Sequence, residues 1–253
     1  MSEPPSALRL AFRAGRGGTT AGLAPGYEQA NIAILPAAHA AAFAAFCRAN
    51  PSACPLLATG LPGDPSLPTL GRDIDIRTDL PGYRVVEHGR SREQADILDL
   101  WRDDCVAFAI GCSYTFEHAL LRAGLRLRHV EQRRKVAMYR TVLRNVATGP
   151  FAGHLVVSMR PLPRAAVPLA TAISARFATM HGAPVHAGDP AALGIADLAR
   201  PDFGDAVDIL DGEVPVFWAC GVTSQVAIEA AGLDLVIGHA PGSMLITDVR
   251  SAS

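Results

Sequence analysis

The feature that most constrains the fold of this chain is a pattern that occurs twice. One copy runs from Cys112 to Gly124 and the other from Cys220 to Gly232, and both fit Cys-x-x-Thr-x-x-x-Ala-x-x-x-Ala-Gly. Each copy follows an apolar run, residues 105–110 or 214–219, that is typical of a buried strand. A Thr before an Ala-rich segment and a Gly after it are typical helix start and stop signals. Each copy therefore predicts a strand, a Cys, an N-cap Thr and a short helix.

These two strand–helix junctions predict thiols beside anion sites. A helix N-terminus presents unpaired N–H groups and partial positive charge, so it binds carboxylates and lowers the pKa of a nearby thiol. Cys112 and Cys220 would thus be reactive, with substrate-binding residues in the first turns: Ser113, Thr115 and Thr223. The alternative is that Cys, Ala and Gly recur at buried turns for packing alone.

Alternating strand and helix patterns along the chain favour the α/β class with a mostly parallel sheet. Consecutive parallel strands end at the same sheet edge, where ligands bind, which would bring Cys112, Cys220 and His239 together, with His129 at the same edge as Cys112. The expected helices are residues 37–48 and 165–179. The remaining expected strands are residues 31–35, 74–76, 83–86, 125–130, 136–143, 155–159, 207–210, 233–237 and 244–248.

Two matching units at either end of a long span predict the domain division. The chain of 253 residues, 49% hydrophobic, can bury a large core in one domain or two. We expect residues 1–125 and 214–253 to form the main α/β domain, with both Cys strands in its sheet. Residues 126–213 are expected to form a smaller inserted α/β domain.

Composition and charge exclude several classes of protein. The net charge of −1 gives no electrostatic basis for binding nucleic acid or an anionic membrane surface. No apolar run approaches the ~20 residues of a membrane span. The five Cys form no Cys-x-x-Cys pair, which argues against structural zinc. Their odd number, and a start that lacks the layout of a secretory signal, favour reduced thiols in a cytoplasmic protein.

Several longer strings together resemble one family, the bacterial hydro-lyases related to D-glutamate cyclase. The resemblance extends from residues 22–26 to residues 247–248. It implies a three-layer α/β/α sandwich joined to a smaller two-layer α/β domain, and a reaction that loses water, such as closure of D-glutamate to 5-oxo-D-proline. The strings are Trp101–Asp104, Gly111–Glu117, Met138–Thr141, Val156–Pro161, His181–His186, Gly188–Pro190, Pro201–Asp205 and Val214–Thr223.

The sequence departs from the family pattern at two positions. The family usually has His after His-Ala-Pro-Gly, where this chain has Ser243, and Asn after Met-Tyr-Arg-Thr, where it has Val142. If either family residue is catalytic, this chain would be altered in activity.

Charged residues in the shared strings are further candidates. Arg140 and Arg160 could clamp a substrate carboxylate, or each could form a structural ion pair. Glu117 could be catalytic, although a carboxylate in a first helical turn is favoured by the helix dipole alone. His181 and His186 could bind substrate; with Asp189 they could also hold a metal, but their spacing fits no standard ligand motif. We expect no metal and no cofactor.

The combined prediction is a hydro-lyase that acts on a small amino or hydroxy acid, with Cys112, Cys220, His239 and Glu117 as catalytic residues. Its partner would be a small carboxylate substrate, and the protein would form a homo-oligomer. One alternative is an amino-acid racemase in which two thiols flank one carbon. Another is a non-catalytic protein that binds a carboxylate metabolite.

Overall fold

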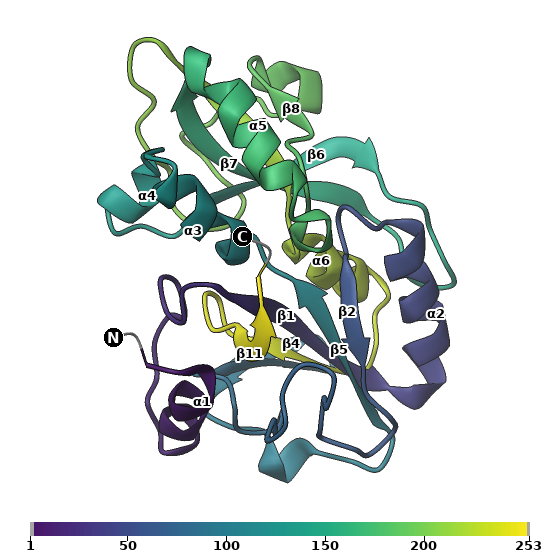
Figure 1. Ribbon diagram of the computed structural model, residues 1–253. Helices are drawn as coiled ribbons and strands as arrows, with labels where there is room; N and C mark the ends of the chain where they lie inside the picture. The colour runs from purple at the N-terminus through teal and green to yellow at the C-terminus, as the bar shows by residue number, and fades with distance from the viewer. Residues whose placement is uncertain (1–2, 252–253) are drawn as a thin grey trace.

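The protein is built on two β-sheets, seen in a computed structural model that describes residues 3–251 (Figure 1). The larger sheet has the order β2-β5-β1-β10-β3-β4, with β11 also paired to β1, and the smaller has the order β6-β7-β9-β8. The strands are β1 (Tyr27–Pro36), β2 (Leu56–Thr59), β3 (Tyr83–Glu87), β4 (Arg90–Gln94), β5 (Cys105–Gly111), β6 (Ala137–Arg144), β7 (His154–Pro163), β8 (His186–Ala187), β9 (Glu213–Ala219), β10 (Leu235–His239) and β11 (Leu245–Arg250).

Helices cover the sheets and connect them. They are α1 (Pro5–Arg13), α2 (Ala37–Ala49), α3 (Tyr114–Arg122), α4 (Arg128–Glu131), α5 (Val167–Ala175) and α6 (Val222–Ala230). In Figure 1, α2 lies beside the larger sheet, while α3 and α5 lie with the smaller sheet. No helix among residues 3–251 is both long and apolar enough to cross a membrane.

The sheets are antiparallel, so the expected mostly parallel sheet is wrong, although the mixed α/β character is confirmed. Central strand β5, for example, pairs antiparallel with β1, with Asn31 opposite Ile110 and Ala33 opposite Phe108. Every residue of β5 is buried. A continuous apolar run is typical of a central parallel strand, but it arises equally in an antiparallel strand covered on both faces. The apolar run therefore predicted a buried strand, but it could not predict whether that strand runs parallel or antiparallel to its neighbours.

The two Cys strands lie in different sheets, contrary to expectation. β5 is in the larger sheet, whereas β9 pairs with β7 along its whole length, from Glu213 to Ala219. The expected return of the chain to the main sheet at residue 214 is therefore wrong for β9. A repeated local pattern predicts the local strand–Cys–helix unit, but pairing between distant strands decides which sheet holds it.

The segment of residues 125–130 is the clearest local error, because we expected a strand. The structure has an irregular stretch followed by α4. Leu125, Leu127 and His129 are buried, as the alternation predicted. Because alternate burial also occurs in irregular backbone, the pattern identified the inward residues but not the conformation. Residues 74–76 and 207–210 also lie outside strands.

Aromatic packing fixes α2 on the larger sheet. Phe43 meets Phe108 of β5 edge-on, with ring centroids 4.9 Å apart, and also contacts Phe151 at 5.1 Å. Burial of each such side chain stabilises the fold by roughly 1.5–3 kcal/mol relative to exposure.

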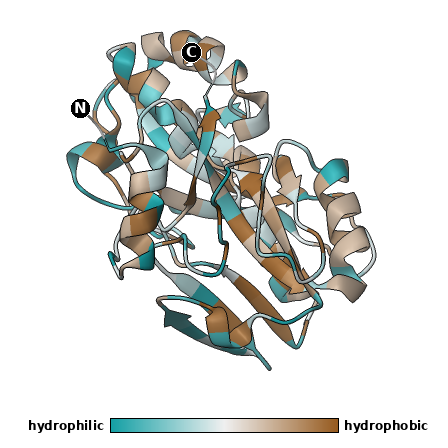
Figure 2. Ribbon diagram, turned by 60° about the horizontal axis from the view of Figure 1, so that its bottom comes forward, coloured by the Kyte–Doolittle hydropathy of each residue, from teal (hydrophilic) through white to brown (hydrophobic). Residues whose placement is uncertain are grey.

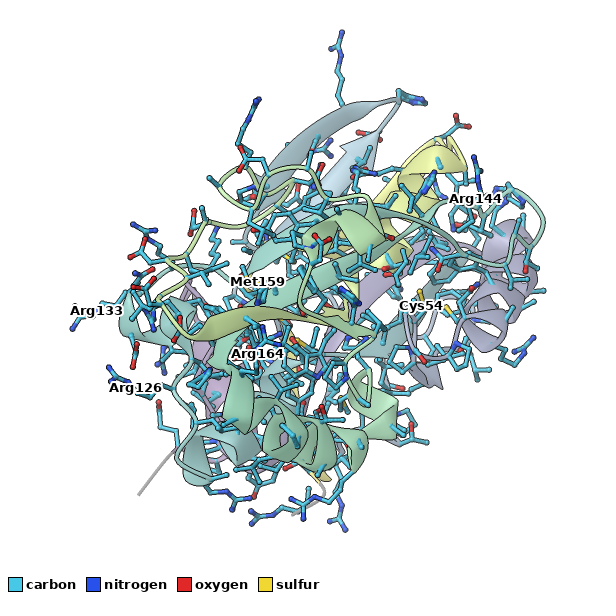
Figure 3. All side chains as sticks on the ribbon, turned by 90° about the horizontal axis from the view of Figure 1, so that it is seen from above. Cys54, Arg126, Arg133, Arg144, Met159 and Arg164 are labelled. Carbon is cyan, nitrogen blue, oxygen red and sulfur yellow. The ribbon has the colours of Figure 1, made fainter. Side chains whose placement is uncertain are left out.

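Hydrophobic residues lie along the central strands (Figure 2). Met159 is buried between elements, whereas Arg126 and Arg133 extend outward (Figure 3).

Candidate active site

A cavity of about 270 Å³ receives residues from both sheets and both Cys junctions. We call it the thiol cavity. Its volume lies just below the roughly 300–1,000 Å³ typical of ligand pockets, which suits a small metabolite. It is lined by Asn31, Arg84, Cys112, Ser113, Tyr114, Lys135, Val136, Met138, His181, Phe203, Gly204, Asp205, Cys220, Gly221, Val222, Gln225, His239, Pro241, Gly242 and Met244.

The two strand–helix junctions are built alike, but their Thr residues are not N-caps. Ser113 and Gly221 are the N-cap residues of α3 and α6. Thr115 Oγ1 accepts a hydrogen bond from the Gln29 N–H at 3.1 Å, and Thr223 Oγ1 accepts one from the Val156 N–H at 3.0 Å. Both hydroxyls thus tie a helix to a neighbouring strand. The structure places neither Thr in the cavity lining, so direct substrate contact by Thr115 and Thr223 has no geometric support.

Both thiols line the cavity, and both have raised pKa values, contrary to the expected lowering. Burial raises the pKa of Cys112 to about 12, although the Tyr114 N–H and Arg160 act in the opposite direction. Burial likewise raises the pKa of Cys220, against the effect of the Val222 N–H. The free energy of desolvating a thiolate is therefore larger than the stabilisation that the helix N-terminus gives it. Both groups are neutral thiols that can donate a proton.

His239 lies in the cavity as a neutral base. Its Nδ1 is 2.9 Å from the Ala240 carbonyl oxygen, which can only accept, so Nδ1 carries the proton. Nε2 therefore has the lone pair and faces the Gln225 amide nitrogen at 3.2 Å. Burial lowers the pKa of His239, which keeps the ring neutral near pH 7.

Arg160 and Glu117 form a buried ion pair behind the cavity rather than in its lining. Arg160 donates to Glu117 Oε1 and, at 3.0 Å each, to the hydroxyls of Ser113 and Ser158. His129 Nε2 is 3.3 Å from Glu117 Oε1. Burial alone would raise the pKa of Glu117, but Arg160 and His129 lower it to about 2. These contacts correspond to the structural ion pair that was the alternative for Arg160, and Ser113 connects the pair to the cavity wall.

The remaining predicted site residues divide between the cavity and the surface. His181 lines the cavity; its Nδ1–H donates to the Ser52 carbonyl at 2.9 Å, and burial lowers its pKa to about 4. His186 lies outside it, with Nε2 bonded to the Asp189 carbonyl oxygen at 2.8 Å. Arg140 is exposed, and its guanidinium lies over Phe203.

The candidate metal ligands do not converge. The carboxylate of Asp189 caps a short 3₁₀ helix by accepting from the Ala191 N–H at 2.9 Å, while His181 is buried in the cavity and His186 lies outside it. Within residues 3–251 no group of three His, Cys, Asp or Glu side chains is arranged to hold a metal ion.

Sequence reasoning missed five polar residues of the cavity: Asn31, Arg84, Tyr114, Lys135 and Gln225. Asn31 interrupts the apolar residues 30–35 of β1, and a polar residue within a buried strand was the available signal. Lys135, the only Lys in the chain, carried no local pattern. The others come from elements that only the tertiary fold brings to the Cys junctions.

The two departures from the family pattern lie outside the cavity lining. Ser243 is buried, and its hydroxyl donates to the Gly18 carbonyl at 3.0 Å. Val142 is 60% exposed on β6. Neither departure therefore replaces a residue of the cavity lining, although Ser243 lies between the lining residues Gly242 and Met244.

Comparison with known proteins shows which family this sequence is similar to. A family model described as D-glutamate cyclase matches residues 106–248, which contain both Cys junctions. A protein of Paraburkholderia phymatum is 60% identical over 93% of this chain and 92% of its own length. One from Jannaschia sp. is 57% identical over 96% of this chain and 92% of its own length. Both carry the name "Putative hydro-lyase".

A solved structure with a similar outline is a nitrogen repressor-like protein from Methanococcus jannaschii. It aligns over 99% of both chains with 12% sequence identity and a TM-score of 0.42. That level of similarity does not establish a shared fold.

Proposed function

This chain belongs to the D-glutamate cyclase family, and on that premise we propose that it is a carbon–oxygen lyase that removes water from a small carboxylate-bearing amino acid. The candidate reaction is closure of D-glutamate to 5-oxo-D-proline. The observation that carries the proposal is the grouping of two neutral thiols and a neutral imidazole around one small cavity, at the N-termini of α3 and α6.

The proton balance of lactam formation fits these groups. The substrate ammonium loses two protons, its nitrogen bonds to the γ-carboxyl carbon, and one carboxyl oxygen gains two protons and leaves as water. A base is needed near nitrogen and an acid near oxygen. His239 Nε2 has the lone pair for the first role. Cys112 or Cys220, protonated at neutral pH, would supply the second.

The cavity also has groups that could bind two carboxylates. The starts of α3 and α6 present backbone N–H groups of the kind that bind anions, and the N-cap residues Ser113 and Gly221 both line the cavity. The cations Arg84 and Lys135 also line the cavity. Arg84 donates to Ser91 Oγ at 3.0 Å, and its guanidinium lies 3.4 Å from Glu229 Oε1. A substrate with two acidic groups matches this distribution.

The paired thiols also favour a second candidate, an amino-acid racemase. A thiol pair that inverts one carbon needs one member as a thiolate to remove the α-proton. The raised pKa values of both Cys112 and Cys220 oppose that state. Incubation in D₂O separates the candidates, because a racemase exchanges the α-hydrogen of recovered substrate and a lactam-forming lyase does not.

The decisive test is a mass-spectrometric screen of D- and L-amino acids and hydroxy acids for loss of water. Cys112→Ala, Cys220→Ala and His239→Ala are then assayed on the best substrate. Loss of an acid–base group should lower the rate by roughly 10²–10⁴-fold. Cys105→Ala is the matched control, because Cys105 is buried outside the cavity. Full activity in all three variants would refute the roles, and recovery of unaltered ligand after binding would favour a non-catalytic protein.

A further inference from the structure

We propose that Asn31 binds the ammonium group of the substrate and thereby makes the thiol cavity selective for amino acids over hydroxy acids. This inference rests on the proposed function and refines its substrate class. Asn31 lies on β1, is 6% exposed and lines the cavity.

The orientation of the Asn31 amide is fixed by its neighbours. Nδ2 donates to the Gly111 carbonyl oxygen at 2.8 Å and lies 3.4 Å from the Ile110 carbonyl oxygen. Because two acceptors surround one end of the amide, that end must be the NH₂ group. The other end, Oδ1, receives no hydrogen bond from any residue between 3 and 251. A buried side chain of the cavity wall thus retains one unused acceptor.

Gly221 holds this amide in place from the second junction. A Cβ atom at Gly221 would lie 2.3 Å from Asn31 Nδ2 and 2.7 Å from Cγ. The N-cap of α6 therefore packs directly on the amide, which only glycine permits. The side chain is clamped between β5 of one sheet and α6, whose preceding strand belongs to the other. A polar group held this rigidly is pre-organised to contact a ligand.

The Asn31 acceptor complements the cationic groups of this cavity. Arg84, Lys135 and the N-termini of α3 and α6 offer positive charge or N–H groups, which suit carboxylates. An ammonium needs acceptors instead, and two buried side chains of the lining offer them: Asn31 through Oδ1, and His239 through Nε2, which also faces the Gln225 amide nitrogen. Asp205 also lines the cavity, but it is exposed and its Oδ2 already accepts from the Lys135 N–H at 2.8 Å. Asn31 Oδ1 would accept one N–H of the substrate amine, and His239 Nε2 would remove another of its protons. These two contacts would orient the nitrogen lone pair for attack.

The test compares ligands that differ only at the amino position. D-glutamate, D-2-hydroxyglutarate and glutarate, with the L-forms and the aspartate, malate and succinate series, are bound to the unmodified protein and to Asn31→Ala. Equilibrium dialysis with mass-spectrometric detection counts bound ligand and any lactam in the same sample. Circular dichroism checks that the variant folds, and Asn31→Ser replaces it if it does not.

We expect the unmodified protein to bind an amino acid about tenfold or more tightly than its hydroxy and unsubstituted counterparts, the range of a hydrogen bond to a charged group. Asn31→Ala should reduce that ratio towards one, whereas a purely structural role would weaken all ligands equally. Equal binding of the hydroxy acid, an unchanged ratio in the variant, or binding of no amino acid in the panel would overturn the inference. Selective binding without lactam would refute the dehydration and leave the inference standing.

Discussion

Thr115 and Thr223 hold equivalent places in the two halves of the protein. Each lies at the second residue of its helix, and each hydroxyl accepts the backbone N–H of a strand next to its own Cys strand: Gln29 of β1 or Val156 of β7. The repeated sequence pattern therefore corresponds to a repeated tertiary contact, and each Thr directly follows a residue of the cavity lining, Tyr114 or Val222.

Thr115→Val and Thr223→Val should each lower the free energy of unfolding by about 1–3 kcal/mol, because a buried N–H loses its acceptor. Urea denaturation measures the change. Thr69→Val is the control, since Thr69 is exposed and should change stability by no more than about 0.5 kcal/mol. Unchanged stability in both junction variants would show that the two contacts do not hold the helices.

Alkylation of Cys112 should be slow at neutral pH and should accelerate as pH rises. The thiol is protonated below its pKa of about 12, and the thiolate is the reactive form. Iodoacetamide labelling between pH 7 and pH 10, read by peptide mapping, reports the rate at each pH. A labelling rate that reaches a plateau below about pH 9 would contradict the raised pKa.

Catalysis should persist at acidic pH to below the usual pKa of histidine. Burial lowers the pKa of His239, so the neutral base remains until pH falls through that lower value. The acid limb of kcat/KM against pH measures it directly. Gln225→Leu removes the amide that faces Nε2 and serves as a comparison. An acid limb at or above about pH 6.5 would be inconsistent with a buried neutral imidazole.

Arg160→Met should lower the free energy of unfolding by about 3–5 kcal/mol, because it leaves the buried Glu117 carboxylate without its cation. The folded-state pKa of Glu117 is about 2 against its ordinary 4.5. Its contribution to stability is thus fully present above pH 4.5 and is lost as pH falls towards 2. Chemical denaturation across that window tests the sign. Glu87→Gln, in an exposed pair with Arg92, should cost less than about 1 kcal/mol.

Gly221→Ala should impair ligand binding by displacing the Asn31 amide, which the new Cβ would approach to 2.3 Å. We expect a loss of amino-acid selectivity that parallels Asn31→Ala. Gly17→Ala is the matched control, because its nearest neighbour is 3.9 Å away and its backbone conformation suits alanine. Equal ligand affinities for Gly221→Ala and the unmodified protein would show that the amide can move without consequence.

Much of the local structure could be predicted from the sequence. The strands at residues 31–35 and 155–159 and the helix at residues 37–48 are confirmed as parts of β1, β7 and α2. Each rests on short-range periodicity and on stop signals within a few residues. The strand–Cys–helix units are confirmed for the same reason, and family membership follows from long ordered strings.

The candidate site was predictable only in part. Cys112 and Cys220 were singled out by the repeated local pattern and His181 by a family string, and all of them line one cavity. His239 lines it too, although it was chosen on the expectation of parallel strands, which is wrong. Arg160 was chosen as a carboxylate clamp but lies behind the cavity with Glu117, whereas Arg84, which carried no motif, lines it. A sequence motif identifies a charged side chain, but it does not show whether that side chain faces the cavity or the protein core.

Short-range patterns in the sequence predicted most of the strands and helices, the points where each Cys meets a helix N-terminus, and the family, because these signals lie in neighbouring residues. The tertiary structure alone places β5 and β9 in separate antiparallel sheets and brings Asn31 against Gly221. It also reversed the expected shift in thiol pKa. Strand pairing and burial are set by residues far apart in the chain, and the cost of desolvating a charge depends on what surrounds it.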